Sequence, residues 1–595
     1  MIIQTTMKNS FYITLTILFT CFCSLSAQEE CNALCVTDLK QLTDQTFALT
    51  SREESSIRIY DRSFKTPLSV IKLPASPTGL VTNNGLCYVT TFDNAKGQLL
   101  VVDPQSKQIK ATIPVGSGAR APLFSGDHKK LYVLNQFANT VSEIDVASLR
   151  CRRTFQVLRE PKAAVIDKEG RYMYVNNFLP AQRADVDTVS ACVSVIDLIS
   201  GERVKDIQLY NGSNALRGIA LSADGKYVFV THNLGRFQVP TSQLQQGWMN
   251  TSAMSVIDTQ SQSFSGSVLL DEPEQGAAGI WGIQCTPDHI IVSHSGTHEL
   301  SLIDYPRFLE AYKSYVNKMS LAYDLRFLYG LRTRYPLHGN SPRDFILNNN
   351  QVIIPTFFSD VVHCFDLNDK TCKDYPLLTN RMETAELKGE KYFNDATYCF
   401  QQWQSCNGCH PGDARTDGMN WDLMNDGIGN PKNCKSMLYS HVTPPSMISG
   451  IRATAEMAVR KGFAFIQFVE MPEEYAECVD AYLKSLRPVV SPYLVDGKLS
   501  EKAQRGQKVF EKYNCSSCHS GPLFTDMKTY RIGEDVEFEK GWDTPTLIEV
   551  WRTAPYLFDG RAATLHDVFE THKHGIEKKI SKKEIEELTE YVNSL

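Results

Sequence analysis

Two Cys-x-x-Cys-His motifs stand in the C-terminal half of this chain, Cys-Asn-Gly-Cys-His at 406–410 and Cys-Ser-Ser-Cys-His at 515–519. Two thiols at this spacing attach a haem through thioether bonds, and the histidine beside them binds the iron. A zinc site or a redox disulfide built from these cysteines would leave both histidines without a role. We therefore predict two covalent haem c groups. The attachment points are Cys406, Cys409, Cys515 and Cys518, and the proximal iron ligands are His410 and His519.

The two motifs belong to an internal duplication. They lie 109 residues apart, and the same offset maps Arg452 onto Arg561. It also maps the helical pattern of 477–486 onto that of 586–595. One offset shared by three landmarks indicates two similar, mainly helical haem lobes.

The second axial position of each iron decides what its haem can do. A strong second ligand makes an electron-transfer haem, whereas an open position can bind peroxide or oxygen. The 109-residue offset places Phe463 opposite His572, and phenylalanine cannot bind iron. This predicts that His572 caps haem two and that haem one is open, with His574 as the weaker alternative ligand. If His441 or Met457 bound haem one, both haems would be electron carriers.

The first half of the chain repeats a β unit, which consists of a short alternating strand, a turn and a second strand that ends in Asp. One clear copy pairs 131–135 with 141–145, and seven such copies end at aspartates spaced 42 to 62 residues apart. This period is typical of propeller blades with one four-stranded sheet each, and the copies resemble Tyr-Val-Thr-Asn-type propellers. We predict an all-β seven-bladed propeller at 28–376 with a helical insertion at 307–331. A β-sandwich is the alternative.

Composition and the N-terminal segment indicate the compartment. The net charge is −6 and basic runs are absent from the sequence, which argues against nucleic acid as a partner. Residues 1–27 contain one lysine, an apolar run at 11–25 and small residues, a pattern typical of a secretory signal peptide. A retained membrane anchor and a lipid anchor at Cys21 are the alternatives, although the run is short for a span and Thr20 suits lipidation poorly. We predict a periplasmic or otherwise extracytoplasmic protein with no transmembrane span in the mature chain.

Eleven cysteines lie outside the signal segment and the two motifs. Cys364 and Cys372 flank an Asn-Asp turn and could bridge a hairpin. Cys31 and Cys35 could form a second disulfide. The odd total leaves at least one thiol free or paired between molecules.

Residues 381–595 resemble the bacterial di-haem cytochrome c peroxidase superfamily, which includes the di-haem enzyme that matures tryptophan-derived quinone cofactors. The resemblance is carried by Asp-Thr-Pro-Thr-Leu at 543–547, Thr-Ala-Pro-Tyr at 553–556 and Asp-Gly-Arg-Ala-Ala-Thr-Leu at 559–565. It implies a sixth ligand for haem two eleven residues after the arginine of the last segment, which is His572 here.

The resemblance also implies a calcium ion between the haems, bound by the side chain of Asn433 and the backbone carbonyls of Thr553 and Pro555. It implies a catalytic carboxylate near haem one, for which Glu470 is the candidate, that moves a proton between the peroxide oxygens. The chain departs from the family at Ile448, where the family has a tryptophan between the haems. A histidine in place of the peroxidases' methionine would lower the reduction potential of haem two.

Together these features predict a multidomain protein, an all-β propeller followed by a mainly α di-haem domain. The predicted segments are a signal peptide at 1–27, the propeller at 28–376, a first cytochrome c lobe at 377–488 and a second at 489–595. The expected function is that of a secreted oxidoreductase of peroxidase type. Electrons would pass between haem two and a peroxide- or oxygen-reactive haem one, and the propeller would bind a substrate or a redox partner, either a protein or a small electron donor. The alternatives are a non-enzymatic electron-transfer adaptor that docks through its propeller, and a propeller enzyme that uses the haems as electron acceptors.

Overall fold

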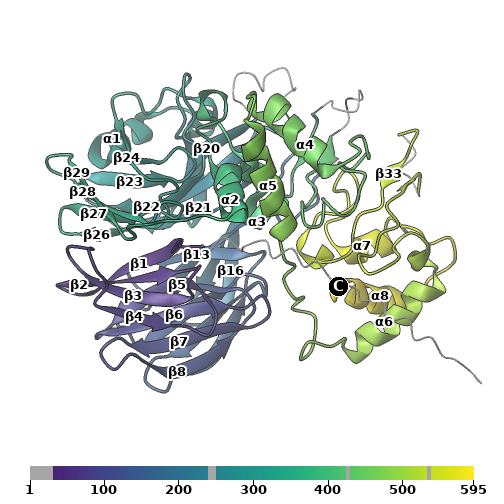
Figure 1. Ribbon diagram of the computed structural model, residues 1–595, viewed down its shortest axis with the longest axis horizontal. Coiled ribbons are helices and arrows are strands. Elements are labelled where there is room, and N and C mark those ends of the chain that lie inside the picture. The colour runs from purple at the N-terminus through teal and green to yellow at the C-terminus, as the bar shows by residue number, and fades with distance from the viewer. Residues whose placement is uncertain (1–30, 239–248, 424–428, 430, 533–537) are drawn as a thin grey trace, which may run out of the picture.

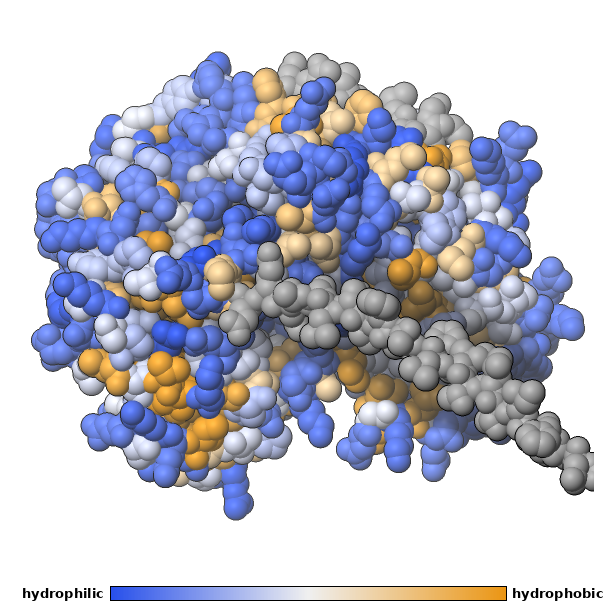
Figure 2. Space-filling model, in the orientation of Figure 1, coloured by the Kyte–Doolittle hydropathy of each residue, from blue (hydrophilic) through white to orange (hydrophobic). Residues whose placement is uncertain are grey.

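The computed structural model describes residues 31–238, 249–423, 429, 431–532 and 538–595. In this part of the chain a β-propeller is followed by a C-terminal region of short helices, which lies along one side of the propeller (Figure 1). The predicted signal peptide at 1–27 lies outside the described residues. None of the described helices has the length and apolar character that crossing a membrane requires. The face shown in Figure 2 is largely hydrophilic, with apolar areas over the lower part of the propeller.

Seven antiparallel sheets form the propeller, so the predicted seven-bladed fold is confirmed. Blades 1 and 2 comprise β1 (Val36–Thr43), β2 (Thr46–Ser51), β3 (Ser56–Asp61), β4 (Ser69–Lys72), β5 (Ser76–Asn83), β6 (Leu86–Phe92), β7 (Gly97–Asp103) and β8 (Gln108–Val115). Blades 3 and 4 comprise β9 (Ala119–Phe124), β10 (Lys130–Asn135), β11 (Thr140–Asp145), β12 (Arg150–Gln156), β13 (Pro161–Ile166), β14 (Tyr172–Asn177), β15 (Cys192–Asp197) and β16 (Glu202–Gln208). Blades 5 and 6 comprise β17 (Ser213–Asn214), β18 (Ile219–Leu221), β19 (Tyr227–Gly235), β20 (Asn250–Asp258), β21 (Ser263–Leu269), β22 (Ile280–Cys285), β23 (His289–His294), β24 (Glu299–Asp304) and β25 (Arg332–Pro336). Blade 7 comprises β26 (Ile346–Asn348), β27 (Gln351–Pro355), β28 (Val361–Asp366) and β29 (Cys372–Pro376), and the predicted helical insertion forms α1 (Tyr305–Ser314) and the 3-10 helix η2 (Lys318–Tyr323).

Burial decreases toward the last strand of each blade. In blade 4, β15 is buried at all but one position, whereas β16 is exposed at all but one. A strand that is covered on both faces has a nearly continuous apolar sequence. The outer strand has a free edge, and its charged side chains prevent that edge from pairing with another chain. The first strands of adjacent blades contact one another, so they line the centre of the propeller.

The ring closes without a strand exchanged between the first and last blades, because β1–β4 and β26–β29 are each contiguous in the chain. Instead, buried Asp360 in the β27–β28 connection accepts hydrogen bonds at 2.8 Å from the backbone N–H groups of Leu34 and Cys35. Its carboxylate also accepts from Nε of Arg381 at 2.9 Å. Asp360 therefore ties the start of blade 1 and the chain leaving blade 7 to one turn.

Neither of the two disulfides that the sequence allows is formed, because Cys31, Cys35, Cys364 and Cys372 are all free thiols. In the β28–β29 hairpin Cys372 pairs with Phe365, the residue after Cys364. Successive side chains of a strand point to opposite faces, so the two cysteines of this hairpin point away from each other. Cys35 is buried while Cys31 is exposed.

The C-terminal region contains two helix pairs that repeat one arrangement. α2 (Ala385–Asn394) crosses α5 (Glu473–Ser485), and α6 (Glu501–Lys512) crosses α8 (Lys582–Asn593). At each crossing a Cβ on the glycine of the first helix would lie 1.9 Å from a carbonyl oxygen of the second, and the pairs are Gly389 with Cys478 and Gly506 with Glu587. Only glycine permits so close an approach, and the two carbonyl residues are 109 apart, as the duplication predicts.

The other elements of this region are short. They are α3 (Pro411–Ala414), α4 (Ala455–Gly462), α7 (Leu565–Glu570), the 3-10 helices η3 (Phe400–Gln402), η4 (Cys406–Gly408), η6 (Cys515–Ser517) and η7 (Val550–Arg552), the π-helical turn η5 (Phe463–Gln467), and the strand pairs β30 (Asn420–Trp421) with β31 (Lys432–Asn433) and β32 (Thr529–Tyr530) with β33 (Trp542–Asp543). Loops and single turns therefore carry both predicted haem motifs.

The offset between the two halves changes within the repeat. α4 and α7 follow equivalent N-cap residues, Thr454 and Thr564, which are 110 residues apart rather than 109. Counted from these caps, Phe463 corresponds to Lys573. The predicted equivalence of Phe463 with His572 is therefore wrong by one residue.

The equivalence of Arg452 with Arg561 is wrong for the same reason. Isolated β-bridges join Arg452 to Ser446 in the first half and Ala562 to Tyr556 in the second. Arg452 thus occupies the position of Ala562. Both corrections follow from one residue that the second half has in excess before Thr564. The offset returns to 109 residues by Cys478 and Glu587.

Replacing Asp360 by Ala tests the closure of the propeller. The change leaves two buried N–H groups and Arg381 without their shared acceptor, so we expect the free energy of unfolding to fall by about 3 to 5 kcal/mol. Urea unfolding of the full chain measures it, with exposed Asp369→Ala in the β28–β29 turn as the control. Equal losses in the two variants would contradict the closing role of Asp360.

Candidate functional site

The two Cys-x-x-Cys-His motifs adopt the same local structure. Each begins with a single 3-10 turn, and in each the histidine Nδ1 lies 3.1 Å from the carbonyl oxygen five residues later, His410 from Arg415 and His519 from Phe524. A ring that donates Nδ1–H to a carbonyl keeps the lone pair on Nε2, the nitrogen that can bind a metal. Burial lowers the pKa of both histidines, which favours this neutral form.

The two competing interpretations of the motifs gain no support. All four motif cysteines are free thiols. Within the described ranges, one group of side chains could hold a metal ion, with its ligand atoms within 4.8 Å of one another. It consists of His363, Cys372 and Asp374 in blade 7. It contains no motif residue, so the structure does not assemble the motifs into a zinc or disulfide site.

A second histidine lies against the second motif. The ring centroids of His519 and His574 are 6.5 Å apart, with the ring planes inclined by 52°. A metal ion bonded to one nitrogen of each ring at about 2 Å would separate the centroids by roughly 6 Å. Burial, with His519 as the second cause, lowers the pKa of His574 to about 4, so this ring is neutral and can act as a ligand. The histidine that faces His519 is therefore His574 rather than His572.

The first motif packs against the propeller on one side. A hydrophobic cluster shared by the propeller and the C-terminal region consists of Val189, Met249, Met419 and Trp421. Cys409 packs against this cluster, and its sulfur accepts a hydrogen bond from Nδ2 of Asn250 at 3.2 Å. The core around the second motif is built from residues 499–595 alone. The two motifs therefore have different surroundings.

Half-buried Cys434 and buried Asp417 lie near the first motif and were absent from the predicted site. The Cys434 thiol lies 3.5 Å from Nδ1 and 3.9 Å from Nε2 of His410, and donates to the Cys409 carbonyl oxygen at 3.1 Å. Burial raises the pKa of Asp417 to about 7, although N–H donors that include the Trp421 indole at 2.8 Å lower it. A carboxyl that titrates near neutral pH can both give and accept a proton.

The residues predicted for the open side of the first motif lie elsewhere. Glu470 is exposed, and the side chain that reaches the first motif cysteine is Gln467, whose Nε2 lies 3.2 Å from the sulfur. His441 is bonded through Nε2 to Asp480 at 2.9 Å, and Met457 is 45% exposed. In the described part of the chain no contact joins His441 or Met457 to the motif.

The residues implied for calcium lie close together, and a guanidinium reaches the same segment. A Cβ on Gly560 would lie 2.9 Å from both Nδ2 of Asn433 and Cγ of Pro555. Nη2 of Arg159, from the propeller, donates to the carbonyl oxygens on either side of Thr553 at 3.1 and 2.7 Å. The protein thus supplies a positive charge at this segment, and calcium stays a prediction.

A buried chain of charges joins the propeller to both halves of the C-terminal region. Glu160, beside β13, pairs with Arg552 at 3.0 Å, and Arg552 pairs with Glu549 at 3.3 Å. Glu549 in turn pairs with Arg415 at 2.8 Å, and all four side chains are at most 5% exposed. The Arg415 carbonyl oxygen is the one bonded to His410, so the chain of charges ends at the first motif.

An aromatic pair lies beside the residue that replaces the family's tryptophan. Ile448 packs against Trp542 of the second half, and its carbonyl oxygen accepts from the N–H of Asp543 at 2.9 Å. Trp542 stacks on Phe558 with a centroid distance of 4.2 Å and an interplanar angle of 8°. Aromatic side chains are therefore present at the boundary between the two halves.

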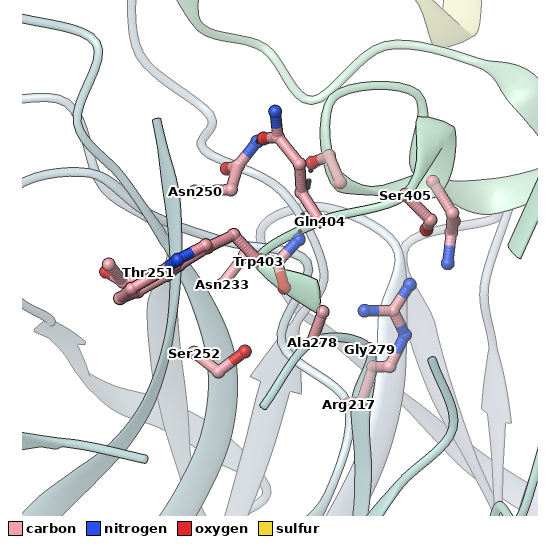
Figure 3. Close-up of a pocket in the computed structure, with 12 residues that line it drawn as sticks. Arg217, Asn233, Asn250, Thr251, Ser252, Ala278, Gly279, Trp403, Gln404 and Ser405 are labelled. Atoms are coloured by element: carbon pink, nitrogen blue, oxygen red, sulfur yellow. Dashed lines mark hydrogen bonds between the residues drawn. The ribbon is translucent and has the colours of Figure 1, made fainter. Parts of the chain in front are cut away.

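A small pocket lies between the propeller and the first motif, beside their direct contacts (Figure 3). Its walls include Arg217, Asn233 and Asn250 on the propeller side and Gln404, Asn407 and Gly408 on the motif side. The Arg217 guanidinium points toward Ser405 in this view. The pocket thus borders the residues between the first two predicted attachment cysteines.

No family model matches this chain. It is similar to hydrazine synthase subunit gamma of Kuenenia stuttgartiensis, with 28% identity over 269 residues, 35% of this chain and 76% of that protein. It is also similar to hydrazine synthase subunit beta of the same organism, with 24% identity over 131 residues, 22% of this chain and 34% of that protein. A solved structure of Kuenenia stuttgartiensis hydrazine synthase matches 58% of this chain and 99% of the solved chain, with a TM-score of 0.51 and 21% identity. The sequence matches show homology to hydrazine synthase subunits, and the structural match shows a shared fold.

Replacing Glu160 by Gln tests the chain of charges through its pH dependence. Burial alone would raise the pKa of Glu160, but Arg552 holds it below its ordinary value of 4.5. The ionised group therefore stabilises the fold fully above pH 4.5, and this contribution is lost as the pH falls through the lowered pKa of the folded state. We expect Glu160→Gln to lower the free energy of unfolding by about 3 to 5 kcal/mol at pH 7 and by progressively less below pH 4.5.

Urea unfolding at a series of pH values measures this difference. Glu202→Gln, an exposed carboxyl-to-amide change on β16, is the matched control. A loss in Glu160→Gln that does not change with pH would contradict the assigned role of the ionised carboxylate.

Proposed function

We propose that this chain is an extracytoplasmic di-haem c-type oxidoreductase whose two haems have different roles. The haem of the first motif would be the site of chemistry, and the haem of the second would store and relay electrons. The observation that carries this proposal is the asymmetry between the two proximal histidines. His519 faces a second histidine, His574, whereas for the first motif the candidate ligand His441 is bonded to Asp480 and Met457 is 45% exposed.

The chain's own residues would control water, protons and orientation at the first site. A haem iron with an open axial position supplies the binding and reduction of a small oxidant. The apolar cluster shared with the propeller would exclude bulk water from one side of the site. Asp417 would hold or release a proton close to Cys434, and the Nδ1–H bond to the Arg415 carbonyl would fix the His410 ring and strengthen it as a donor.

The similarity to two hydrazine synthase subunits, gamma and beta, supports a redox reaction on a small molecule within a larger assembly. We infer that one polypeptide here combines stretches similar to two separate subunits. Electrons would cross between the halves near the Trp542 and Phe558 pair, which lies beside Ile448. Peroxidase chemistry, which the motif resemblance implies, is one form of this proposal, so peroxide is the first oxidant to test.

Spectroscopy of the loaded protein tests the division of roles. Protein matured in a host that attaches c-type haem should carry two haems by intact mass, and electron paramagnetic resonance of the oxidised form should show one low-spin and one high-spin haem. His574→Ala should convert the low-spin haem to high-spin because a strong nitrogen ligand is lost. The matched change His572→Ala should leave the spectrum unaltered.

Two outcomes would count against this assignment. Two low-spin signals in the unaltered protein would favour the electron-transfer adaptor over the enzyme. A low-spin signal that survives His574→Ala but not His572→Ala would return the ligand to the position predicted from the sequence.

The proton role is tested by Asp417→Asn. Asparagine keeps an acceptor for the Trp421 indole but cannot exchange a proton, so we expect the reaction with hydrogen peroxide to slow by about 10²-fold or more while both haem spectra are retained. Stopped-flow absorbance measures the rate. Glu470→Gln makes the same chemical change at an exposed carboxylate and should leave the rate unchanged. The reverse pattern would assign the proton transfer to Glu470.

A further inference from the structure

Four cationic side chains converge at the central channel of the propeller. Arg120 lies on β9 and Lys162 on β13, the first strands of blades 3 and 4. Arg217 precedes β18 and Arg343 precedes β26, so each residue enters from a different blade. Because the first strands line the centre of the propeller, the four residues surround one space.

Aromatic rings link three of these cations to one another. Arg217 and Arg343 both lie over the Trp281 ring, with guanidinium carbons 4.8 and 4.4 Å from its centroid. Lys162 and Arg217 share the Phe178 ring, at 4.5 and 5.8 Å. Each of these three cations therefore lies close to another one. The cation–π contacts favour this arrangement, and the repulsion between like charges opposes it.

The cations lack anionic partners. Among the described residues no ion pair within 4 Å joins any of the four to a carboxylate, and Nε of Arg120, Arg217 and Arg343 is buried without a hydrogen-bond acceptor. Arg217 is only 5% exposed, and Arg120 has one side-chain bond, to Oε1 of Gln136 at 2.5 Å. Buried charges without partners are costly, so such a cluster is expected to bind counter-charge.

The carboxylates near the cluster act on it without a direct ion pair. Asp413 follows Gly412, whose Cβ position lies 3.2 Å from the Phe178 ring, and the pKa of Asp413 is held below its ordinary value, against the effect of burial, by Arg552 and Lys162. Asp344 adjoins Arg343 in the chain. Glu160 also acts on Arg120 and Lys162, and Glu390 acts on Arg343, but none of these carboxylates forms an ion pair with a member of the cluster.

The electrostatic balance agrees with this geometry. Burial, followed by repulsion from Arg343, lowers the pKa of Arg217 to about 9. Burial also lowers the pKa of Arg343 to about 10, and burial together with Arg120 lowers that of Lys162. The surroundings of the site therefore disfavour the charged forms of these side chains. A bound anion would raise their pKa values again.

We propose that the channel binds a small oxyanion held by Arg217, Arg343 and Lys162. An oxyanion suits these groups because the planar guanidinium offers parallel N–H donors that match two oxygens of one anion. Arg217 also lines the pocket whose walls include Asn407 and Gly408, so this guanidinium lies between the cationic cluster and the first motif (Figure 3). The proposal involves no haem, so its failure would leave the proposed function intact.

Calorimetric titration of the full chain with sodium sulfate, and separately with sodium nitrate, tests the site at constant ionic strength set by sodium fluoride. We expect saturable binding of at least one of the two anions. Arg217→Met keeps an unbranched side chain over Trp281 and removes the charge, and should weaken binding at least about tenfold. Arg152→Met, at a side chain that is 55% exposed on β12, is the matched control and should leave the affinity unchanged.

Sulfate stronger than nitrate would indicate that the site prefers a dianion, and the reverse order would indicate a planar monoanion. If Arg217→Met does not fold, Lys162→Met takes its place with the same expected loss. Absence of saturable binding of both anions would overturn the proposal. Binding that both Arg217→Met and Lys162→Met leave unchanged would overturn it as well.

Discussion

The arrangement of this molecule depends on a buried chain of four charges, Glu160, Arg552, Glu549 and Arg415, that runs from the propeller through the second half of the C-terminal region to the first. Each inner member has two opposite charges beside it, so desolvation is offset only while all three parts of the protein are in place. Because the backbone of Arg415 bonds to His410, the geometry of the first motif depends on the assembly of parts far away in sequence. Stability and function therefore share one set of contacts.

The propeller is a wall of the first site as well as a neighbouring domain. Val189 and Met249 complete the apolar cluster beside Cys409, and Asn250 bonds to its sulfur. The second motif has a core drawn from its own half. A duplicated unit has thus become asymmetric mainly through what covers it, since both copies retain the same turn and the same Nδ1 bond.

Features set by local spacing could be predicted from the sequence. The repeat of strands such as 131–135 and 141–145 identified the blades because each blade is built from consecutive residues. The motif residues and the carbonyl residues at the two helix crossings, Cys478 and Glu587, follow the 109-residue offset for the same reason. One added residue before Thr564 changed the register, so Phe463 corresponds to Lys573 rather than to His572. His572 was chosen by its spacing to Arg561, whereas the ring that faces His519 in the fold is that of His574. Asp417 and Cys434 could not be predicted, because their chemistry arises from burial between segments and not from any spacing.

Arg159 places a covalently bound positive charge at the junction between the propeller and the C-terminal region. Its guanidinium holds the carbonyl oxygens around Thr553 and reaches them from the propeller. A cation that belongs to the polypeptide cannot dissociate, compete with other ions or be removed by a chelator. The part of this junction that Arg159 makes therefore forms together with the fold itself.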